Sequence, residues 1–317
     1  MTTRFARLLH YVMALCLALL ACACATARDA GTLRIGYQKY GTLTILKALG
    51  SLDKALGEQG IAIKWVEFPA GPQLLEGLNV GSIDFGTVGE APPIFAQAAG
   101  APLVYVGNEP PAPESEAILV PHDSPIRSVA DLRGKKVALN KGSNVHYLLV
   151  KHLEKAGVAY RDVQVAYLTP ADARAAFERG SVDAWVIWDP YEAAAEASTG
   201  ARILADGTGL VSNYQFYFST KKFLEHDGKA ADTVLEALKE VDEWTKNNID
   251  KVAEQLSPSV GLPAPVLAVS LRRESYGIKP ISDDVIASQQ RIADTFLQLK
   301  LLPRAIKVSD IQRKPGT

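Results

Sequence analysis

Four short motifs, each where a predicted strand runs into a predicted helix, carry the residues best suited to bind a small anion. They combine glycine, amide and hydroxyl groups with little positive charge. The candidate residues are Gln38, Tyr40, Gly41 and Thr42 in the first motif; Gly89, Glu90 and Pro92 in the second; Gly142, Ser143, Asn144 and His146 in the third; and Trp188 with Asp189 in the fourth. Unpaired N–H groups and the positive end of the helix dipole at such junctions receive anions. Several helix N-termini that converge on one cleft could hold a tetrahedral oxyanion without Arg or Lys.

The expected binding energy is sufficient for this interpretation. Three or four charge-assisted hydrogen bonds contribute ~1.5–3 kcal/mol each. After the cost of ordering, about 8 kcal/mol remains, which corresponds to micromolar affinity. The alternative is that the same residues are ordinary helix caps: Ser143 and Asp189 suit N-cap positions, and Thr169 with Asp172 forms a capping box that we interpret as structural.

Three further side chains at these junctions have more than one interpretation. His146 lies one turn into its helix, where the dipole disfavours a protonated ring, so it is either a neutral N–H donor to the anion or an ordinary half-buried histidine. Glu90 and Asp189 are acids at expected anion sites. Asp189 suits a helix cap, and either acid could instead face an amine on the ligand or hold the closed cleft together.

Two tryptophans lie in one predicted strand, at positions 185 and 188. Their odd spacing places them on opposite faces of the sheet. Trp188, nearer the strand end, is predicted to line the cleft for an aliphatic chain, and Trp185 to pack in the core.

Signals for enzymatic chemistry are weak. The sequence has no nucleophile elbow, P-loop or H-E-x-x-H motif. Tyr147 and Lys151 have the spacing of a dehydrogenase pair, but no glycine-rich turn follows the first strand, so we interpret this as chance. The histidines after the N-terminal segment do not have metal-ligand spacing. We therefore predict a protein that is not an enzyme and has no cofactor or metal.

The N-terminal segment, residues 1–27, has the pattern of a secretory signal peptide. Arg4 and Arg7 precede an apolar stretch over residues 8–20, which is shorter than the ~20 residues of a membrane span. Small residues follow, and cleavage after Ala25 or Ala27 fits. A lipid anchor through Cys22 is the less favoured alternative. The protein is therefore expected in the periplasm.

Cleavage would also change the composition. All three cysteines (Cys16, Cys22 and Cys24) precede Ala25, so the mature chain would contain no thiol chemistry. The full chain of 317 residues has a net charge of −1. Removing two arginines and no acids leaves 32 basic against 35 acidic residues, a net charge of −3. This balance lacks the basic surplus of a nucleic-acid-binding protein.

Short apolar stretches alternate with helical patterns from Gly31 onward, which predicts an α/β fold with mainly parallel sheets flanked by helices. The predicted strands cover residues 33–38, 62–68, 83–88 and 103–107 in a first set, and 116–121, 136–140, 163–168, 184–188 and 202–205 in a second. Two sets predict two sheets and two lobes. Predicted helices cover residues 143–156, 170–179 and 190–198, then 228–247, 250–257, 264–275 and 282–299.

The last group of helices is expected to pack back onto the first lobe. This predicts a discontinuous lobe 1, residues 28–115 and 214–317, and a lobe 2, residues 116–213. The passages 115–121 and 213–219 would cross between the lobes as a hinge, with the ligand in the cleft between them. We include Tyr214, in the second passage, among the candidate ligand-binding residues.

The same junctions resemble those of the aliphatic sulfonate-binding proteins that supply ABC importers. The resemblance rests on RIGYQK, WVEFPAGPQLLEGLNVGSIDFG, PPIFAQAAG, VADLRGKKVALNKGSNVHYLLVK, LTPADARAAFERGSVDAWVIWDPY and GLPAPV, between residues 34 and 266. It implies a two-lobed periplasmic-binding-protein fold of type II that closes on its ligand. Two residues depart from the expected pattern: Tyr40 replaces a small residue, and Glu90 replaces an aspartate.

The resemblance implies a monomer that captures alkanesulfonates for sulfur acquisition. Its partner would be a membrane permease with a cytoplasmic ATPase. Three alternatives stay open: a binding protein for another anion such as taurine or nitrate, an enzyme similar to thiamin-pyrimidine synthases, and the effector domain of a regulator. The second would need a cysteine-rich iron motif, and the third an attached DNA-binding or membrane segment. Neither feature is found in the sequence after residue 27.

Overall fold

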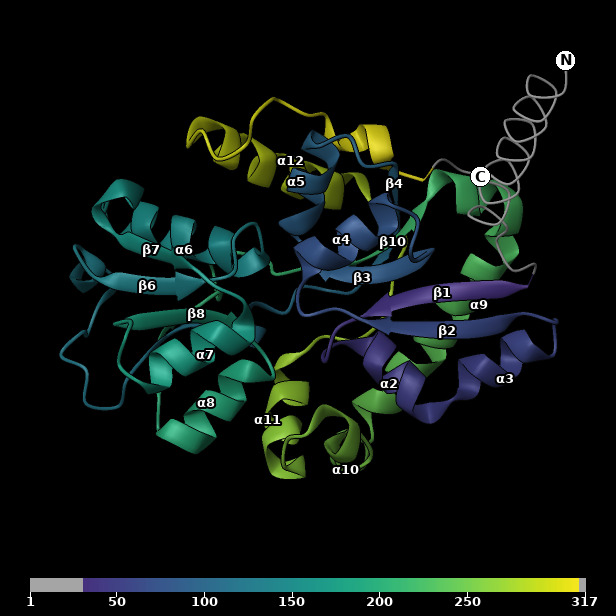
Figure 1. Ribbon diagram of the computed structural model, residues 1–317, viewed down its shortest axis with the longest axis horizontal. Helices are drawn as coiled ribbons and strands as arrows, with labels where there is room; N and C mark the ends of the chain where they lie inside the picture. Colours follow the sequence, from purple (N-terminus) through teal and green to yellow (C-terminus); the bar gives the residue numbers. More distant parts are fainter. Residues whose placement is uncertain (1–30, 314–317) are drawn as a thin grey trace, which may run out of the picture.

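Two five-stranded sheets lie side by side in the computed structural model, which describes residues 31–313 (Figure 1). The first sheet has the order β2-β1-β3-β10-β4. Its strands are β1 (Thr32–Tyr37), β2 (Ala62–Glu67), β3 (Phe85–Gly89), β4 (Leu103–Asn108) and β10 (Gln215–Thr220). The second sheet has the order β7-β6-β8-β5-β9. Its strands are β5 (Glu116–Val120), β6 (Lys136–Leu139), β7 (Gln164–Tyr167), β8 (Ala184–Trp188) and β9 (Arg202–Asp206).

All nine predicted strands are present within two residues of their expected ends, because each is a short, strongly apolar stretch. The sheets are mixed rather than wholly parallel. β1 runs parallel to β2 and β3, and β6 runs parallel to β7 and β8. β10 and β5 are antiparallel to both of their neighbours. Each of these two strands is the first that the chain enters after passing from one sheet to the other, so its direction differs from the rest.

We call the first sheet with its helices the first lobe. Its early helices are α2 (Thr42–Leu49), α3 (Ser51–Gly57), α4 (Gly71–Asn79) and α5 (Pro92–Ala98). Its late helices are α9 (Lys221–Lys246), α10 (Ile249–Val260), α11 (Ala264–Arg273) and α12 (Asp283–Gln298), with the 3-10 turn η4 (Val308–Ile311). α9 packs against α2 and α3, and α12 packs against α5. The non-helical backbone of Asp227 interrupts α9 just before the predicted helix start at 228.

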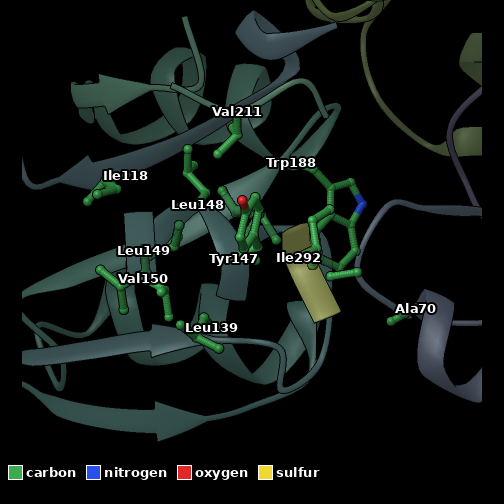
Figure 2. Close-up of a cluster of buried hydrophobic side chains, with 14 of the residues drawn as sticks. Ala70, Ile118, Leu139, Tyr147, Leu148, Leu149, Val150, Trp188, Val211 and Ile292 are labelled. Atoms are coloured by element: carbon green, nitrogen blue, oxygen red, sulfur yellow. The ribbon is translucent and has the colours of Figure 1, made fainter. Parts of the chain in front are cut away.

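The second lobe consists of the second sheet with α6 (Asn144–Lys155), α7 (Pro170–Glu178) and α8 (Tyr191–Thr199). The 3-10 turns are η1 (Pro113–Ser115), η2 (Val129–Leu132) and η3 (Tyr160–Asp162). Every residue of β8 is buried, which agrees with a central strand covered on both faces. Figure 2 shows Leu149 and Val150 of α6 near Leu139 of β6, and Trp188 on the side that faces Ala70 of the first lobe.

The chain passes between the sheets twice, over residues 109–115 and 207–214. The predicted signal peptide, its cleavage sites and Cys22 lie outside the described residues. No helix in the described part of the chain is long and apolar enough to cross a membrane.

Candidate functional site

A small cavity lies between the two lobes, at the carboxyl ends of strands from both sheets. Residues from both lobes and from both passages line it: Tyr40, Gly89, Ser115, Asn144, Trp188, Asn213, Tyr214, Gln215 and Glu274. None of these described lining residues is Lys or Arg. The free space is about 20 Å³, room for about one water molecule. A larger ligand therefore enters only if the lobes or lining side chains move.

Three of the lining residues, Ser115, Asn144 and Asn213, are joined by hydrogen bonds; together with Gly89, which faces Asn144 across the cleft, we call them the amide group. The Asn144 amide nitrogen donates to Glu116 Oε2 at 2.5 Å and to Asn213 Oδ1 at 2.9 Å. Asn213 donates in turn to Ser115 Oγ at 3.0 Å and to the carbonyl of Ala112 at 2.9 Å. This chain of bonds ties the start of α6 to both passages between the lobes.

Glycine is required at Gly89 and Gly41 because of close contacts. A Cβ on Gly89 would lie 2.8 Å from Asn144 Oδ1, across the cleft. Gly41 has a φ of 75°, and a Cβ there would lie 2.6 Å from Gln215 Oε1. Small residues at these junctions therefore allow the lobes and β10 to approach closely.

Two buried carboxyls stand behind the amide group. Glu90 is 1% exposed, and its Oε2 accepts the N–H of Tyr214 at 3.2 Å. Burial raises the pKa of Glu90 to about 7, although the N–H groups of Tyr214 and Asn213 partly oppose this. Burial and the nearby charge of Glu90 also raise the pKa of Glu116 well above its usual value. Burial therefore shifts both acids toward the neutral form.

A second set of lining residues, Tyr40, Trp188 and Glu274, combines two rings with a carboxyl; we call it the aromatic–carboxyl group. The ring centroids of Tyr40 and Trp188 lie 6.5 Å apart. Burial raises the pKa of the Tyr40 hydroxyl, and the charge of Glu274 adds to this effect. Burial, then the charge of Asp189, raises the pKa of Glu274 to about 8.

His146 is fully buried and does not line the cavity. Its Nε2 is 2.7 Å from Tyr160 Oη, and its Nδ1 accepts the N–H of Gly142 at 3.3 Å. Burial lowers the pKa of His146 to about 4, and Lys141 adds to this, so the ring is neutral as expected. Both nitrogens are used to brace the turn at the start of α6.

Several other predicted site residues have partners inside their own lobe. Gln38 donates to the carbonyl of Thr87 at 3.1 Å, and Thr42 donates to Asp242 at 2.9 Å. Ser143 is the N-cap residue of α6, but its hydroxyl donates to the carbonyl of Asn140 at 2.7 Å. Pro92 is buried at the first position of α5. None of these four residues is among those that line the cavity.

Asp189 is part of an ionic contact between the lobes. Its Oδ1 accepts the N–H of Ala193, but the N-cap residue of α8 is Pro190, so Asp189 lies one residue before the N-cap position that we predicted for it. The guanidinium of Arg273, at the end of α11, lies 3.4 Å from Asp189, 2.9 Å from Glu192 and 2.6 Å from Glu196. Figure 1 shows α11 beside α8 at this contact. Burial raises the pKa of both Asp189 and Glu192, although Arg273 opposes both shifts.

An aromatic contact joins the lobes elsewhere. Phe296 of α12 lies 4.8 Å from Phe95 of the same lobe and 5.2 Å from His146 of the other, measured between ring centroids. This contact contributes to the burial of His146. Trp185 is fully buried, as predicted for the core.

Sequence reasoning missed four lining residues. Ser115, Asn213 and Gln215 lie within the two passages predicted to cross between the lobes, 115–121 and 213–219, but no local pattern marks their side chains as ligand contacts. Glu274 follows α11, far away in the sequence, and no local pattern marks it. Between residues 31 and 313, no three His, Cys, Asp or Glu side chains are grouped so that they could hold a metal ion.

Two α/β lobes, two connecting passages and a cavity between them define a periplasmic-binding-protein fold. The model of the family described as NMT1/THI5 like matches residues 56–251, and the chain belongs to this family.

Individual relatives agree with this assignment. The chain is 50% identical over 278 residues to an Escherichia coli (strain K12) protein named "Putative aliphatic sulfonates-binding protein", covering 87% of this chain and 86% of that one. A Bacillus subtilis (strain 168) protein of the same name is 36% identical, with 88% and 85% covered. The solved structure of the alkanesulfonate-binding protein SsuA from Xanthomonas axonopodis pv. citri, bound to MOPS, is 43% identical with a TM-score of 0.85. The aligned region covers 90% of this chain and 99% of the SsuA chain.

Proposed function

We propose that this protein captures aliphatic sulfonates outside the cytoplasm and delivers them to an ABC importer for sulfur acquisition. The observation that carries the proposal is the cavity between the lobes, lined from both sides by amide, hydroxyl and aromatic groups without Lys or Arg. The names of the two relatives and of the solved structure support sulfonates as the ligand class.

The sulfonate would lie against the amide group. Asn144 is the first residue of α6, and no side chain caps this helix. Its first N–H groups therefore lack partners within the helix and can bind an anion. The N–H groups of Gly142 and Ser143 already donate to His146 Nδ1 and the Asn140 carbonyl. We therefore assign anion contact to the N–H groups of residues 144 and 145 and to Gly89.

Binding would close the two lobes around the ligand. Because the cavity holds about one water molecule, a sulfonate must enter while the lobes are further apart. Contacts to both lobes would then favour the closed arrangement. The lobe boundaries that we propose are 28–115 with 214–317 for the first and 116–213 for the second.

Export and assembly complete the proposal. Residues 1–27 would direct secretion to the periplasm and be removed, with a lipid anchor through Cys22 as the alternative. The mature protein would act as a monomer. Its partner would be the importer's membrane permease.

Calorimetry on the mature chain tests the ligand class. We expect micromolar affinity for at least one alkanesulfonate from ethane- to octanesulfonate, and a rise of at most ~0.8 kcal/mol for each added methylene. Nitrate should bind much more weakly, because it lacks an apolar tail. Failure of every sulfonate to bind, or tighter binding of nitrate, would overturn the proposal. A sharp preference for a two-carbon ligand would favour the taurine alternative.

The enzyme alternative has little support from the chain's chemistry. The sequence contains cysteine only at positions 16, 22 and 24, within the predicted signal peptide, so a cysteine-rich iron motif has no residues to form it. The relatives with the strongest similarity reported above are named as binding proteins.

A further inference from the structure

Glu109 and Asp242 form a pair of buried carboxyls beside the passages between the lobes, and the sulfonate proposal uses neither. Glu109 is the first residue of the passage 109–115 and is 3% exposed, and Asp242 of α9 is fully buried. The two carboxyls are hydrogen-bonded to each other. Two ionised carboxylates are acceptors only, so this bond requires one proton between them.

Asp242 is surrounded by hydrogen-bond donors. It accepts the hydroxyl of Thr42, at the start of α2, at 2.9 Å. It also accepts the N–H groups of Gly277 and Ile278, both at 2.9 Å. Hydrogen bonds from such donors favour the ionised form of a carboxyl. Asp242 is therefore the member of the pair that suits the negative charge.

The surroundings of Glu109 suit a charge less well. Its Oε1 accepts the Tyr217 hydroxyl at 2.6 Å, but its Oε2 is buried without a donor among the described residues. Burial, and then the charge of Asp242, raises the pKa of Glu109 well above its usual value. The other titratable groups that face the pair are the hydroxyls of Tyr217 in β10 and of Tyr276 after α11. The proton therefore lies on Glu109, which donates it in the bond to Asp242.

Glu109 also holds a residue of the cavity wall. Its N–H donates to the carbonyl of Gln215 at 2.9 Å. The side-chain amide of Gln215 donates to the Tyr217 hydroxyl at 3.3 Å, and that hydroxyl donates to Glu109. Gln215 lines the cavity and is the first residue of β10, directly after the passage 207–214. The carboxyl pair therefore joins both passages between the lobes to α9 and to one wall of the cavity.

We propose that protonated Glu109 is a positioning residue, whose bond to Asp242 holds Gln215 and the two passages in the arrangement that binds the ligand. Loss of the proton would leave two carboxylates in contact in a buried place, where like charges repel strongly. The first passage would then move away from α9, and ligand affinity would fall as the pH rises. The inference rests on the proposed function where it concerns ligand affinity.

Glu109→Gln tests the positioning role through the pH dependence of binding. Glutamine has the shape of the protonated acid, and its amide can donate to Asp242 at every pH. Calorimetry with butane-1-sulfonate should give the wild type and the variant similar affinities at pH 6. At pH 9 the wild type should bind about fivefold or more weakly than the variant, the lower end of couplings between sites. Glu90 and Glu274 titrate in both proteins, so the ratio of the two dissociation constants isolates Glu109.

Urea unfolding without ligand tests the shared proton itself. Because the folded pKa of Glu109 is raised above its unfolded value, its contribution to stability is fully present below about pH 4.5 and is lost as the pH rises through the folded pKa. The urea midpoint of the wild type should therefore fall relative to that of Glu109→Gln between pH 6 and 9. Asp242→Asn, which removes the charge that opposes ionisation of Glu109, is the second variant and should also show a smaller fall than the wild type.

Glu67→Gln is the matched control. Glu67 also accepts a tyrosine hydroxyl, that of Tyr37 at 3.2 Å, but its side chain is 49% exposed and has no buried carboxyl beside it. This variant should follow the wild type in both measurements at every pH.

The outcomes separate the two proposals. If butanesulfonate does not bind the wild type at any pH, the proposed function fails, and urea unfolding still decides whether the proton is shared. If the midpoints of wild type and Glu109→Gln keep a constant difference from pH 6 to 9, the shared proton is wrong. If those midpoints diverge while the ratio of dissociation constants stays constant, Glu109 stabilises the fold and does not position the cavity wall.

Discussion

The amide group and the aromatic–carboxyl group line the same cavity but are held in different ways. Asn144 and Asn213 are fixed by bonds to each other, to Glu116 and to both passages between the lobes. Tyr40 and Trp188 contact each other through their rings, and the Tyr40 hydroxyl also bonds to Gln38. A network of amide hydrogen bonds suits a polar head group of fixed geometry, and an aromatic surface suits a variable apolar tail. Changes to the first should therefore remove binding, and changes to the second should alter selectivity.

Asn144→Asp should produce the largest effect. It places a carboxyl 2.5 Å from Glu116 Oε2, in a buried position that we assign to the sulfonate. Loss of donated hydrogen bonds and repulsion of the anion should weaken butanesulfonate by about 3 kcal/mol or more, a hundredfold or greater. Calorimetry measures this, with thermal unfolding to verify folding. Near wild-type affinity of Asn144→Asp for butanesulfonate would show that the amide group does not bind the sulfonate head group.

Glu90→Gln tests the buried acid behind the amide group through the pH dependence of stability. Burial raises the folded pKa of Glu90 from 4.5 to about 7, so the folded state binds the proton more tightly than the unfolded chain. This contribution is fully present below about pH 4.5 and is lost as pH rises through 7. Urea unfolding should therefore show Glu90→Gln gaining stability relative to wild type between pH 5 and 8, by up to about 3 kcal/mol.

Glu116 and Glu274 titrate in both proteins, so the difference between wild type and variant isolates Glu90. Equal pH dependence of the two unfolding free energies would show that Glu90 has an ordinary pKa.

Tyr40→Ala tests whether the aromatic–carboxyl group limits the tail. Tyr40 fills the cavity beside Trp188 where the resemblance led us to expect a small residue. Removing the ring should favour ligands with long alkyl chains. The binding free energy of octanesulfonate should become more favourable relative to that of ethanesulfonate by about 1–2 kcal/mol, which corresponds to the burial of one or two more methylenes. Tyr40→Phe, which keeps the ring, is the matched control and should leave the ratio unchanged. A uniform loss for all chain lengths would assign Tyr40 a structural role.

Lys39→Ala and Lys141→Ala should have the smallest effects. Lys39 lies 3.9 Å from Glu67 and is 40% exposed, and Lys141 lies over the ring of Tyr167. Neither lines the cavity. Each substitution should weaken sulfonate binding by less than about 1 kcal/mol, as for a screened surface charge. Loss of binding in either variant would require a direct cation contact and would contradict the account of the head group.

The sequence predicted the strand ends that form the cleft more reliably than the side chains that line it. Tyr40, Gly89, Asn144, Trp188 and Tyr214 line the cavity because the ends of neighbouring strands converge in an open α/β sheet. Whether they bind a ligand stays a prediction.

Several predicted site residues do not line the cavity because their side chains have partners far away in the sequence. Thr42 bonds to Asp242, 200 residues away, and His146 bonds to Tyr160 and packs on Phe296. No local pattern reveals such partners, so a residue with a suitable side chain could not be separated from one already engaged. Glu274 is the opposite case: it reaches the cavity only because α11 packs between the lobes.

A crystal structure of the mature chain with butane-1-sulfonate tests the central claim most directly. The account predicts a ligand enclosed between the lobes, with its sulfonate oxygens at the start of α6 and at Gly89, and its alkyl chain beside Tyr40 and Trp188. A ligand bound outside the cleft, or one whose sulfonate is held by a Lys or Arg side chain, would contradict it.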